Sequence, residues 1–372
     1  MRTNRLLTAL AASAALVVGA AACGSSSTSN SSSSGSSSSG SNSAKVSGTV
    51  NGAGSTFAAP VYQQFGSQLK GQGVTVNFQP VGSGAGVAAL AQGTAQFAGS
   101  DPALAPADKA TLKKGSPVQI PVFFGAITAS YNVSGLKSGL KLDGPTLANI
   151  FLGKITTWND PAIAKLNAGV KLPGAKITVV HRSDDSGTTK GFTTFLSAYS
   201  PTWKSSVGAD KTVKWPTGTG AKGNDGVAAA IKQTDNSIGY VEQAYALANG
   251  FTYASVKNRS GAFIAPTLAS TSAAGDGLTI PSDLGVSTID APGKTAYPIA
   301  SQTFIDTYKD PCKALGMKQG DAKAMGAFIK YVLGDGQTQL AQLKYAKLPS
   351  ALLSKSQQAA SSLTCNGSSL GA

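Results

Sequence analysis

The chain has 372 residues, of which 44 are Gly and only 13% are charged, and its formal net charge is +14. A four-ligand Cys/His zinc site would need its single His and all three Cys, and the cysteines are too few for a disulfide-rich scaffold. A Ser-His-Asp hydrolase would have to use His181. The basic surplus suits nucleic acid, an anionic surface or an anionic ligand. Because the basic residues are spread thinly, the sequence supports nucleic-acid binding only weakly.

Residues 1–22 have the pattern of a secretory signal peptide. Arg2 and Arg5 precede an uncharged run from Leu6 to Ala22 that is rich in Ala, Leu and Val. A transmembrane anchor is the alternative, but the run is short for one and alanine contributes little to insertion. The small residues before Cys23 resemble the lipobox of bacterial lipoproteins, which implies that Cys23 carries lipid (palmitate). Ala20 departs from the usual lipobox, which prefers Leu three residues before the cysteine.

Residues 23–45 are predicted to be the lipidated cysteine and an unfolded tether. The segment after Cys23 is almost wholly Ser, Gly, Asn and Thr, a composition that cannot bury enough apolar surface to fold. The two remaining cysteines, Cys312 and Cys365, lie in the C-terminal part of the chain. An extracytoplasmic compartment permits a disulfide between them, and two separate buried thiols are the alternative.

From about residue 45 onward, short β-like runs alternate with Ala-rich helical stretches. The predicted strands are 74–78, 97–101, 117–129, 176–180 and 237–241. The predicted helices are 86–92, 145–151, 188–198 and 242–248. Residues 221–226 and 273–277 are predicted to be loops. This alternation indicates an α/β architecture with mainly parallel sheets.

Four segments share one design, in which small and hydroxyl-bearing residues follow a strand end and precede a helix. They are residues 52–57, 82–86, 98–101 and 182–188. Glycine lets the backbone approach a ligand, and free N–H groups at a helix start attract an anion. A single such turn is merely a helix cap, whereas four of them, one containing Arg182, favour an anion site. Nucleotide binding is unsupported, because a Walker A pattern is absent from the sequence.

Six segments in the same order together resemble the PstS family, the substrate-binding proteins of phosphate ABC transporters. They are residues 52–62, 81–84, 97–101, 157–167, 181–188 and 238–242. The resemblance runs from about residue 50 to the C-terminus. It implies a two-lobed type II periplasmic-binding-protein fold with the ligand in the cleft between the lobes. Lobe I would comprise residues 46–122 and 297–372, and lobe II residues 123–296.

The resemblance also implies a phosphate site with nine members. They are Thr56, Phe57 (through its N–H), Ser83, Asp101, Arg182, Asp184, Ser186, Gly187 (through its N–H) and Thr188. Hydroxyls, N–H groups and one guanidinium can replace the hydration that an oxyanion loses on burial. Asp185 stands where the family often has Gly, and we expect its side chain to face solvent.

Asp101 is predicted to select phosphate. A carboxylate aimed at an anion is repulsive unless the ligand donates a proton to it. Phosphate retains a proton near neutral pH and sulfate does not, so Asp101 would reject sulfate. The alternative is that Asp101 caps a helix entered at Pro102.

The implied function is extracytoplasmic binding of inorganic phosphate and its delivery to ABC permease subunits driven by an ATPase, without catalysis, cofactor, metal or nucleic acid. The alternatives are a binding protein for sulfate or another tetrahedral oxyanion, a secreted phosphatase-like protein, and a surface adhesin or signalling lipoprotein. Structural roles are expected for His181, Trp158, Trp203, Trp215, Tyr240 and Glu242. Removing the signal peptide lowers the formal net charge from +14 to +12, which remains a diffuse field that draws anions.

Overall fold

The computed structural model describes residues 46–372, so the predicted signal peptide, the predicted lipidation site Cys23 and the predicted tether lie outside the described residues. The strands are β1 Gly48–Gly54, β2 Val74–Pro80, β3 Phe97–Ser100, β4 Pro117–Asn132, β5 Lys141–Leu142, β6 Thr178–Arg182, β7 Thr219–Ala221, β8 Ser237–Glu242, β9 Thr252–Tyr253, β10 Ser255–Lys257, β11 Phe263–Ile264, β12 Ala300–Tyr308, β13 Thr364–Cys365 and β14 Ser368–Ser369. The helices are α1 Ala59–Lys70, α2 Ser83–Gln92, α3 Pro106–Thr111, α4 Gly144–Phe151, α5 Pro161–Leu166, α6 Gly187–Tyr199, α7 Pro201–Ser206, α8 Gly223–Gln233, α9 Gln243–Ala248, α10 Leu268–Ala273, α11 Pro311–Leu315, α12 Gln319–Leu333, α13 Asp335–Gln339 and α14 Ser350–Ser361.

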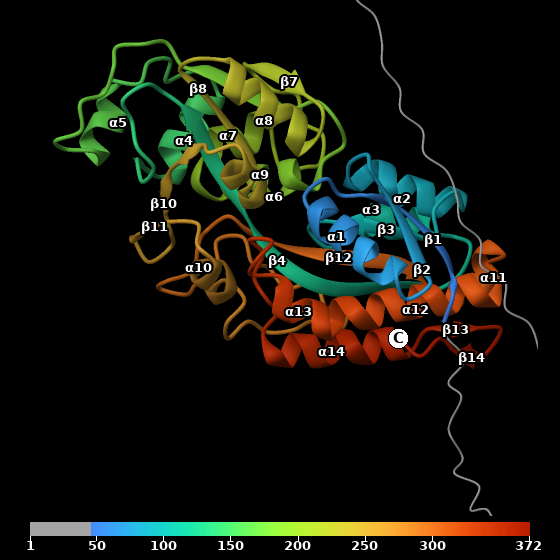
Figure 1. Cartoon of the computed structure of the whole chain (residues 1–372). Helices are drawn as coiled ribbons and strands as arrows, with labels where there is room; N and C mark the ends of the chain where they lie inside the picture. The colour runs from blue at the N-terminus through green and yellow to red at the C-terminus, as the bar shows by residue number, and fades with distance from the viewer. Residues whose placement is uncertain (1–45) are drawn as a thin grey trace, which may run out of the picture. The chain divides into compact units, whose positions relative to one another are not determined.

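One nine-stranded sheet connects two halves of the described chain, in the order β2-β1-β3-β12-β4-β8-β6-β7 with β9 also paired to β4. The 16-residue strand β4 pairs with β12 over its first part and with β8 over its second. It runs from the half that holds α1 and α2 into the half that holds α4 and α8 (Figure 1). The chain therefore leaves the first half along β4 and returns along β12.

The prediction of mainly parallel sheets is wrong. Strands β1, β2 and β3 pair in parallel, as do β6, β7 and β8. The central pairs β3–β12, β12–β4 and β4–β8 are antiparallel. Two strands that carry the chain out of one half and back into it must run in opposite directions when they lie side by side, which makes the sheet mixed.

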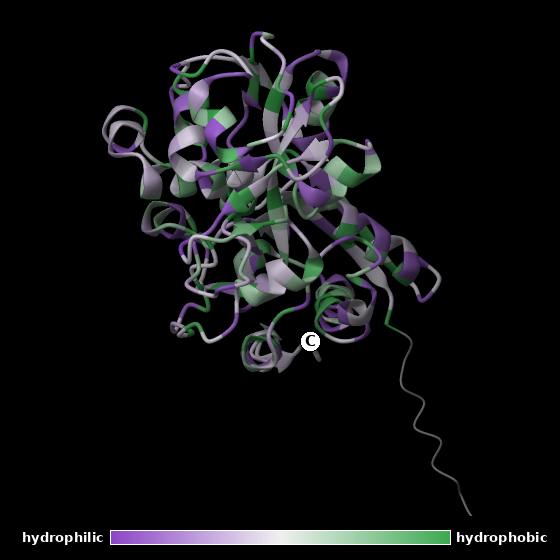
Figure 2. Ribbon diagram, turned by 90° about the vertical axis from the view of Figure 1, so that its left-hand side faces the viewer, coloured by the Kyte–Doolittle hydropathy of each residue, from purple (hydrophilic) through white to green (hydrophobic). Residues whose placement is uncertain are grey.

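The first half has an aromatic core on the sheet formed by β1 to β3. Phe65, Phe97, Phe123 and Phe328 are fully buried with Tyr62, whose ring makes edge contacts with Phe97, Phe123 and Phe328. These residues come from α1, the strands β3 and β4, and α12, so the core joins both ends of the described chain. Figure 2 shows the hydrophobic residues along the central strands and the hydrophilic residues mainly on the outer loops and helices.

The second half packs its helices around β6 and β8. Trp158 and Trp203 are fully buried, and Trp215 is partly buried between His181 and Tyr240. The indole N–H groups of Trp158 and Trp203 donate to the backbone carbonyls of Asn236 and Gly208. The packing roles predicted for the three tryptophans are therefore confirmed.

The nine predicted strands and helices are present, with ends shifted by up to three residues. Residues 221–226 are not a loop, since β7 ends at Ala221 and α8 begins at Gly223. Gly223 and Gly226 argued for a loop, but Gly223 has φ +73°, a conformation that suits glycine at this helix start. None of the helices within residues 46–372 is long and apolar enough to cross a membrane.

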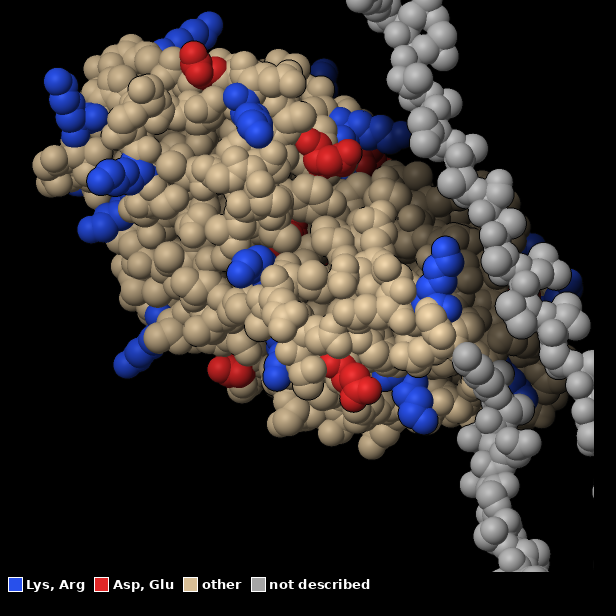
Figure 3. Space-filling view, in the orientation of Figure 1, with Lys and Arg blue, Asp and Glu red and all other residues tan. Residues whose placement is uncertain are grey.

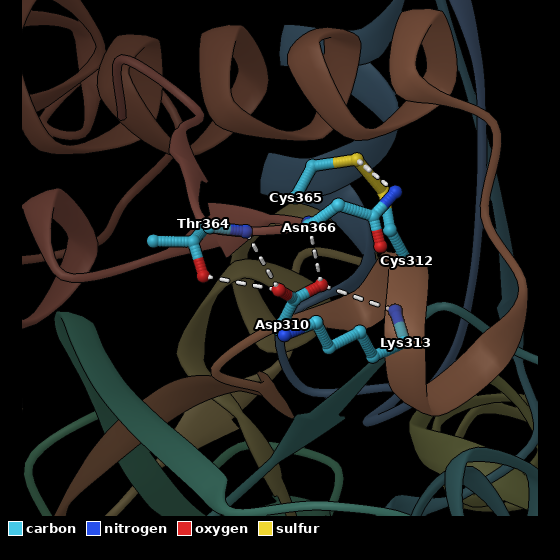
Figure 4. Close-up of a disulfide and its surroundings, with 7 residues drawn as sticks. Asp310, Cys312, Lys313, Thr364, Cys365 and Asn366 are labelled. Carbon is cyan, nitrogen blue, oxygen red and sulfur yellow. Dashed lines mark hydrogen bonds between the residues drawn. A yellow bond between two sulfur atoms is a disulfide. The ribbon is translucent and has the colours of Figure 1, made fainter.

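The C-terminal clasp consists of α11, β13 and β14, joined by a disulfide between Cys312 and Cys365 (Figure 4). Asp310, the N-cap residue of α11, lies two residues before Cys312 of this disulfide. The backbone N–H of Thr364 donates to the carbonyl of Lys309, which ties the clasp to the end of β12. The sequence left this pairing open, because two cysteines 53 residues apart carry no local signal of their proximity.

Candidate anion-binding site

The four Gly/Ser/Thr turns meet between the two halves. The N–H of Ser55, after β1, donates to the carbonyl of Gly99 on β3. The N–H of Gly84, in the first turn of α2, donates to the carbonyl of Asp185, after β6. A Cβ at Gly187 would collide with Asp101, which places the start of α6 against the end of β3. Turns at the carboxyl ends of β1, β2 and β3 in one half and of β6 in the other half thus form one site.

Arg182 is the buried cation of this site. It ends β6 and is only 3% exposed. Its guanidinium binds Asp184 with two hydrogen bonds, Nε to Oδ1 at 2.7 Å and Nη2 to Oδ2 at 2.5 Å, and Nη1 donates to Thr188 Oγ1 at 3.3 Å. Burial raises the pKa of Asp184, but the hydrogen bonds and charge of Arg182 outweigh it and hold that pKa below its ordinary value. The pair therefore holds a charged guanidinium in one orientation.

Ser186, Gly187 and Thr188 form the start of α6. Ser186 is the N-cap residue, and its Oγ accepts from the N–H of Thr189 at 3.1 Å. All three residues are buried. The first N–H groups of a helix lack partners within the helix, so this turn presents donors toward Asp101 and Arg182.

Asp101 is a carboxylate buried without full hydrogen bonding. It is 1% exposed; Oδ1 accepts from the Ser55 hydroxyl and from Thr303 Oγ1, while Oδ2 lacks a partner within the described residues. Burial raises its pKa to about 6, against the lowering effects of Ser55 and Arg182. It caps no helix, since α3 begins at Pro106 with Ala105 as its N-cap, which overturns the capping alternative.

Ser83, Thr56 and Phe57 complete the set on the first half. Ser83 opens α2, is 1% exposed, and its Oγ has no partner among residues 46–372. Thr56 is 3% exposed, and its Oγ1 accepts from the backbone and side-chain nitrogens of Asn224. Phe57 packs its ring in the core, and its carbonyl accepts from the Tyr345 hydroxyl. All nine predicted site residues therefore lie in the four turns that meet between the halves.

A PBP superfamily domain matches residues 39–336 of the chain. The phosphate-binding protein PstS of Pasteurella multocida is 41% identical over 313 residues, 83% of this chain and 89% of that protein. The protein of the same name from Xylella fastidiosa (strain Temecula1) is 39% identical over 308 residues, 82% of each chain.

The chain belongs to the PstS family. A solved structure of a high-affinity periplasmic phosphate-binding protein, PfluDING, bound with phosphate, superposes with a TM-score of 0.67 at 22% identity, covering 84% of this chain and 93% of that chain. The predicted periplasmic-binding-protein fold is therefore confirmed.

Sequence reasoning missed three polar residues that complete this PstS-family site. Asn224, Thr303 and Ser55 are each at most 1% exposed and bind Thr56 or Asp101. Ser55 lies inside the motif at residues 52–57. Asn224 lay in a segment predicted as a loop, and Thr303 lay in a strand that the sequence analysis did not identify.

The residues expected to be structural surround the site rather than enter it. His181 is half-buried and stacks on Trp215, and burial lowers its pKa. The Tyr240 hydroxyl accepts from the backbone N–H of Arg182, and Tyr240 is fully buried. Glu242 is fully buried; its Oε2 accepts from the N–H of Ala244 at 2.7 Å and lies 3.0 Å from the Tyr345 hydroxyl. These contacts are structural, as expected.

Asp185 is exposed, as expected, but its carboxylate lies against Gly84 at the start of α2. Burial raises its pKa, and Lys211 opposes that rise. Lys211 also forms an ion pair with Asp108 of α3, so that it links the segment before β7 to the first half. Asp185 thus belongs to a charged rim beside the buried turns.

The wider surface carries charge sparsely. Lys and Arg side chains stand as separate groups over the face shown in Figure 3. Within residues 46–372, no group of three or more His, Cys, Asp or Glu side chains is arranged to hold a metal ion.

Proposed function

We propose that the site binds inorganic phosphate. The observation that carries this proposal is the pairing of Arg182 and a set of neutral donors with Asp101, whose buried Oδ2 has no partner among the described residues. Three or four oxyanion oxygens can accept from the donors, and one protonated oxygen can donate to Asp101. Sulfate offers no such proton, so Asp101 would repel it.

The nine site residues act together as a substitute for water. Arg182 supplies charge and two-pronged geometry, the hydroxyls of Thr56, Ser83 and Thr188 donate, and the helix start at Gly187 supplies backbone N–H groups. Such fixed donors offset the desolvation of a buried oxyanion. The anion is bound and released unchanged, without a covalent step.

The site lies between two lobes that we propose to be residues 46–122 with 297–372 and residues 123–296. Closure of such lobes around a ligand is a hinge motion, with β4 and β12 as the crossing strands. The loaded form would deliver phosphate to ABC permease subunits driven by an ATPase. Family membership and the fold support this role.

The N-terminal segment is proposed to anchor the protein outside the cytoplasm. Cleavage before Cys23 and lipidation of its thiol would leave residues 23–45 as a tether to the cell membrane. Metabolic labelling with palmitate should mark the wild-type chain and not a Cys23→Ala variant. Equal labelling of both chains would exclude Cys23 as the lipidated residue.

The binding proposal is tested by calorimetric titration with phosphate and with sulfate. Wild-type protein should bind phosphate at least about a hundredfold more tightly than sulfate, because a buried acceptor without its donor costs a few kcal/mol. Asp101→Asn should lose most of this preference. Asp310→Asn, which changes a carboxylate in the C-terminal clasp, should keep it. Sulfate binding by the wild type at comparable affinity would exclude the phosphate assignment.

A further inference from the structure

Asn224 connects two of the hydroxyl groups in the site. It lies in the first turn of the 11-residue helix α8 and is fully buried. Its Nδ2 is 2.9 Å from Thr56 Oγ1 and 3.2 Å from Thr188 Oγ1. Thr56 follows β1 in the first half and Thr188 lies in the first turn of α6 in the second, so one amide holds hydroxyls from both halves.

A backbone contact sets the orientation of the Asn224 amide. The N–H of Glu242 lies 2.9 Å from the Asn224 side-chain oxygen. A backbone N–H can only donate, so the amide atom facing Glu242 must be Oδ1. The NH₂ group therefore faces Thr56 and Thr188, where it can only donate.

Both threonine hydroxyls already accept two hydrogen bonds. Thr56 Oγ1 accepts from Asn224 Nδ2 and from the Asn224 backbone N–H at 3.2 Å. Thr188 Oγ1 accepts from Asn224 Nδ2 and from Arg182 Nη1 at 3.3 Å. A hydroxyl has two acceptor lone pairs and one proton. With both lone pairs used, each hydroxyl can engage another group only by donating its proton.

We propose that Asn224 is a positioning residue that commits Thr56 and Thr188 to act as donors to the bound anion. The proposal rests on the phosphate function proposed above and extends it. Within residues 46–372 neither hydroxyl donates to another protein group, so both protons are available to a ligand. Asp101 is then the hydrogen-bond acceptor among site groups that otherwise donate. This arrangement matches an oxyanion that carries one proton and can donate it to Asp101.

The first test replaces the amide by an apolar group of similar size, Asn224→Leu. Phosphate affinity should fall about tenfold to a hundredfold, because the two hydroxyls can then turn away from the anion. Asn258→Leu is the matched control. Asn258 is 3% exposed and binds three backbone carbonyls, those of Gly293, Lys294 and Ala296. This control should lower the Tm and leave phosphate affinity within about threefold of the wild type.

A double-mutant cycle separates positioning from general damage. If Asn224 acts through the Thr56 hydroxyl, the fold-loss caused by Asn224→Leu should shrink at least threefold in a Thr56→Val background. An undiminished loss in that background would overturn the proposal, as would unchanged affinity in Asn224→Leu itself. Wild-type protein that binds no phosphate would instead overturn the proposed function.

A second variant covers the case in which Asn224→Leu fails to fold. Asn224→Asp keeps the side-chain shape and the Oδ1 that accepts from Glu242, but it replaces the NH₂ donor by an acceptor oxygen. The Thr56 and Thr188 hydroxyls would then donate to the new carboxylate, and phosphate affinity should fall at least tenfold at pH 7. Wild-type affinity in a folded Asn224→Asp protein would contradict the proposal.

Discussion

Asp101 in the candidate site and Asp310 in the C-terminal clasp are carboxylates with opposite surroundings. Asp310 accepts four hydrogen bonds, from the N–H groups of Lys313, Asn366 and Gly367 and from the Thr364 hydroxyl (Figure 4). Burial alone would raise its pKa, but these donors hold that pKa below its ordinary value.

Asp101 has one oxygen without a partner among residues 46–372, and burial raises its pKa to about 6. A carboxylate whose partners all come from the protein stabilises the fold. A buried carboxylate that lacks one partner costs stability, and a ligand can offset that cost. The site and the clasp should therefore respond differently to mutation, one mainly in affinity and the other mainly in stability.

The largest effect is expected from Arg182→Met. It removes the buried cation of the site and leaves Asp184 without its partner, so phosphate affinity should fall about a hundredfold to several thousandfold by calorimetry. Arg259→Met is the control, because the Arg259 side chain is 60% exposed where it pairs with Asp290. Equal losses in both variants would show that charge in general, rather than the Arg182 geometry, draws the anion.

Unlike Arg182→Met, loss of the disulfide should lower the stability of the fold and leave phosphate affinity nearly unchanged. Cys312→Ser combined with Cys365→Ser opens a loop with a sequence separation of 53 residues, and chain entropy predicts a loss of about 4 kcal/mol in the free energy of unfolding. Phosphate affinity of the folded protein should stay within about threefold of the wild type, because the clasp contributes no site residue. Denaturant unfolding measures the free energy of unfolding, and calorimetry measures phosphate affinity. A large loss of affinity would contradict the view that the clasp acts on stability alone.

The two carboxylates should differ in the pH dependence of stability. The folded pKa of Asp101 lies above its unfolded value of 3.8, so the folded state binds more protons and loses stability as the pH rises from about 4 to 6. Asp101→Asn should therefore raise the free energy of unfolding of the ligand-free protein at pH 7 by roughly 2–3 kcal/mol, with the gain vanishing near pH 4.

Asp310→Asn should show the reverse sign. The folded pKa of Asp310 is lowered, so its contribution is present above its unfolded pKa and is lost as the pH falls through the folded pKa. The variant should lose about 1 kcal/mol at pH 7, because the NH₂ group of Asn cannot accept the hydrogen bonds that Gly367 and Thr364 donate to Oδ2, and less in acid. Thermal unfolding from pH 3 to pH 8 measures the stability of both variants. A change of stability with the same sign in both at pH 7 would contradict the opposite surroundings assigned to the two carboxylates.

The smallest effect is expected at the charged rim. Lys211→Gln breaks the ion pair between Lys211, whose side chain is 13% exposed, and Asp108, whose side chain is 17% exposed. This variant should weaken phosphate binding about threefold to fivefold at low salt. Added salt should reduce the difference. Lys109→Gln removes a more exposed ion pair on the same helix, with Asp283, and should leave the affinity unchanged. A salt-independent loss in Lys211→Gln would point to a structural defect instead.

The residue types of the site could be predicted because they lie in short motifs whose local chemistry is visible. Ser186 caps α6 through Thr189, three residues away, and Arg182 binds Asp184, two residues away. Such contacts form wherever the chain makes the same turn. The strands and helices around these turns could also be predicted, because hydrophobic periodicity is likewise a pattern of residues close together in the sequence.

The contacts that complete the site could not be predicted, because their partners are far apart along the chain. Asn224 binds Thr56 across 168 residues, and Thr303 binds Asp101 across 202. These pairs depend on β4 and β12 crossing between the halves and pairing antiparallel, which no local pattern indicated.

The amino-acid sequence by itself thus determined the four turns that meet between the halves, because capping and turn geometry act within a few residues, and the resemblance to the PstS family implied which of their residues bind the anion. Only the tertiary structure decided which oxygen of Asp101 stays without a partner in the described part of the chain and which way the Asn224 amide faces. The physical reason is that burial and hydrogen-bond saturation depend on groups that the fold brings from distant segments.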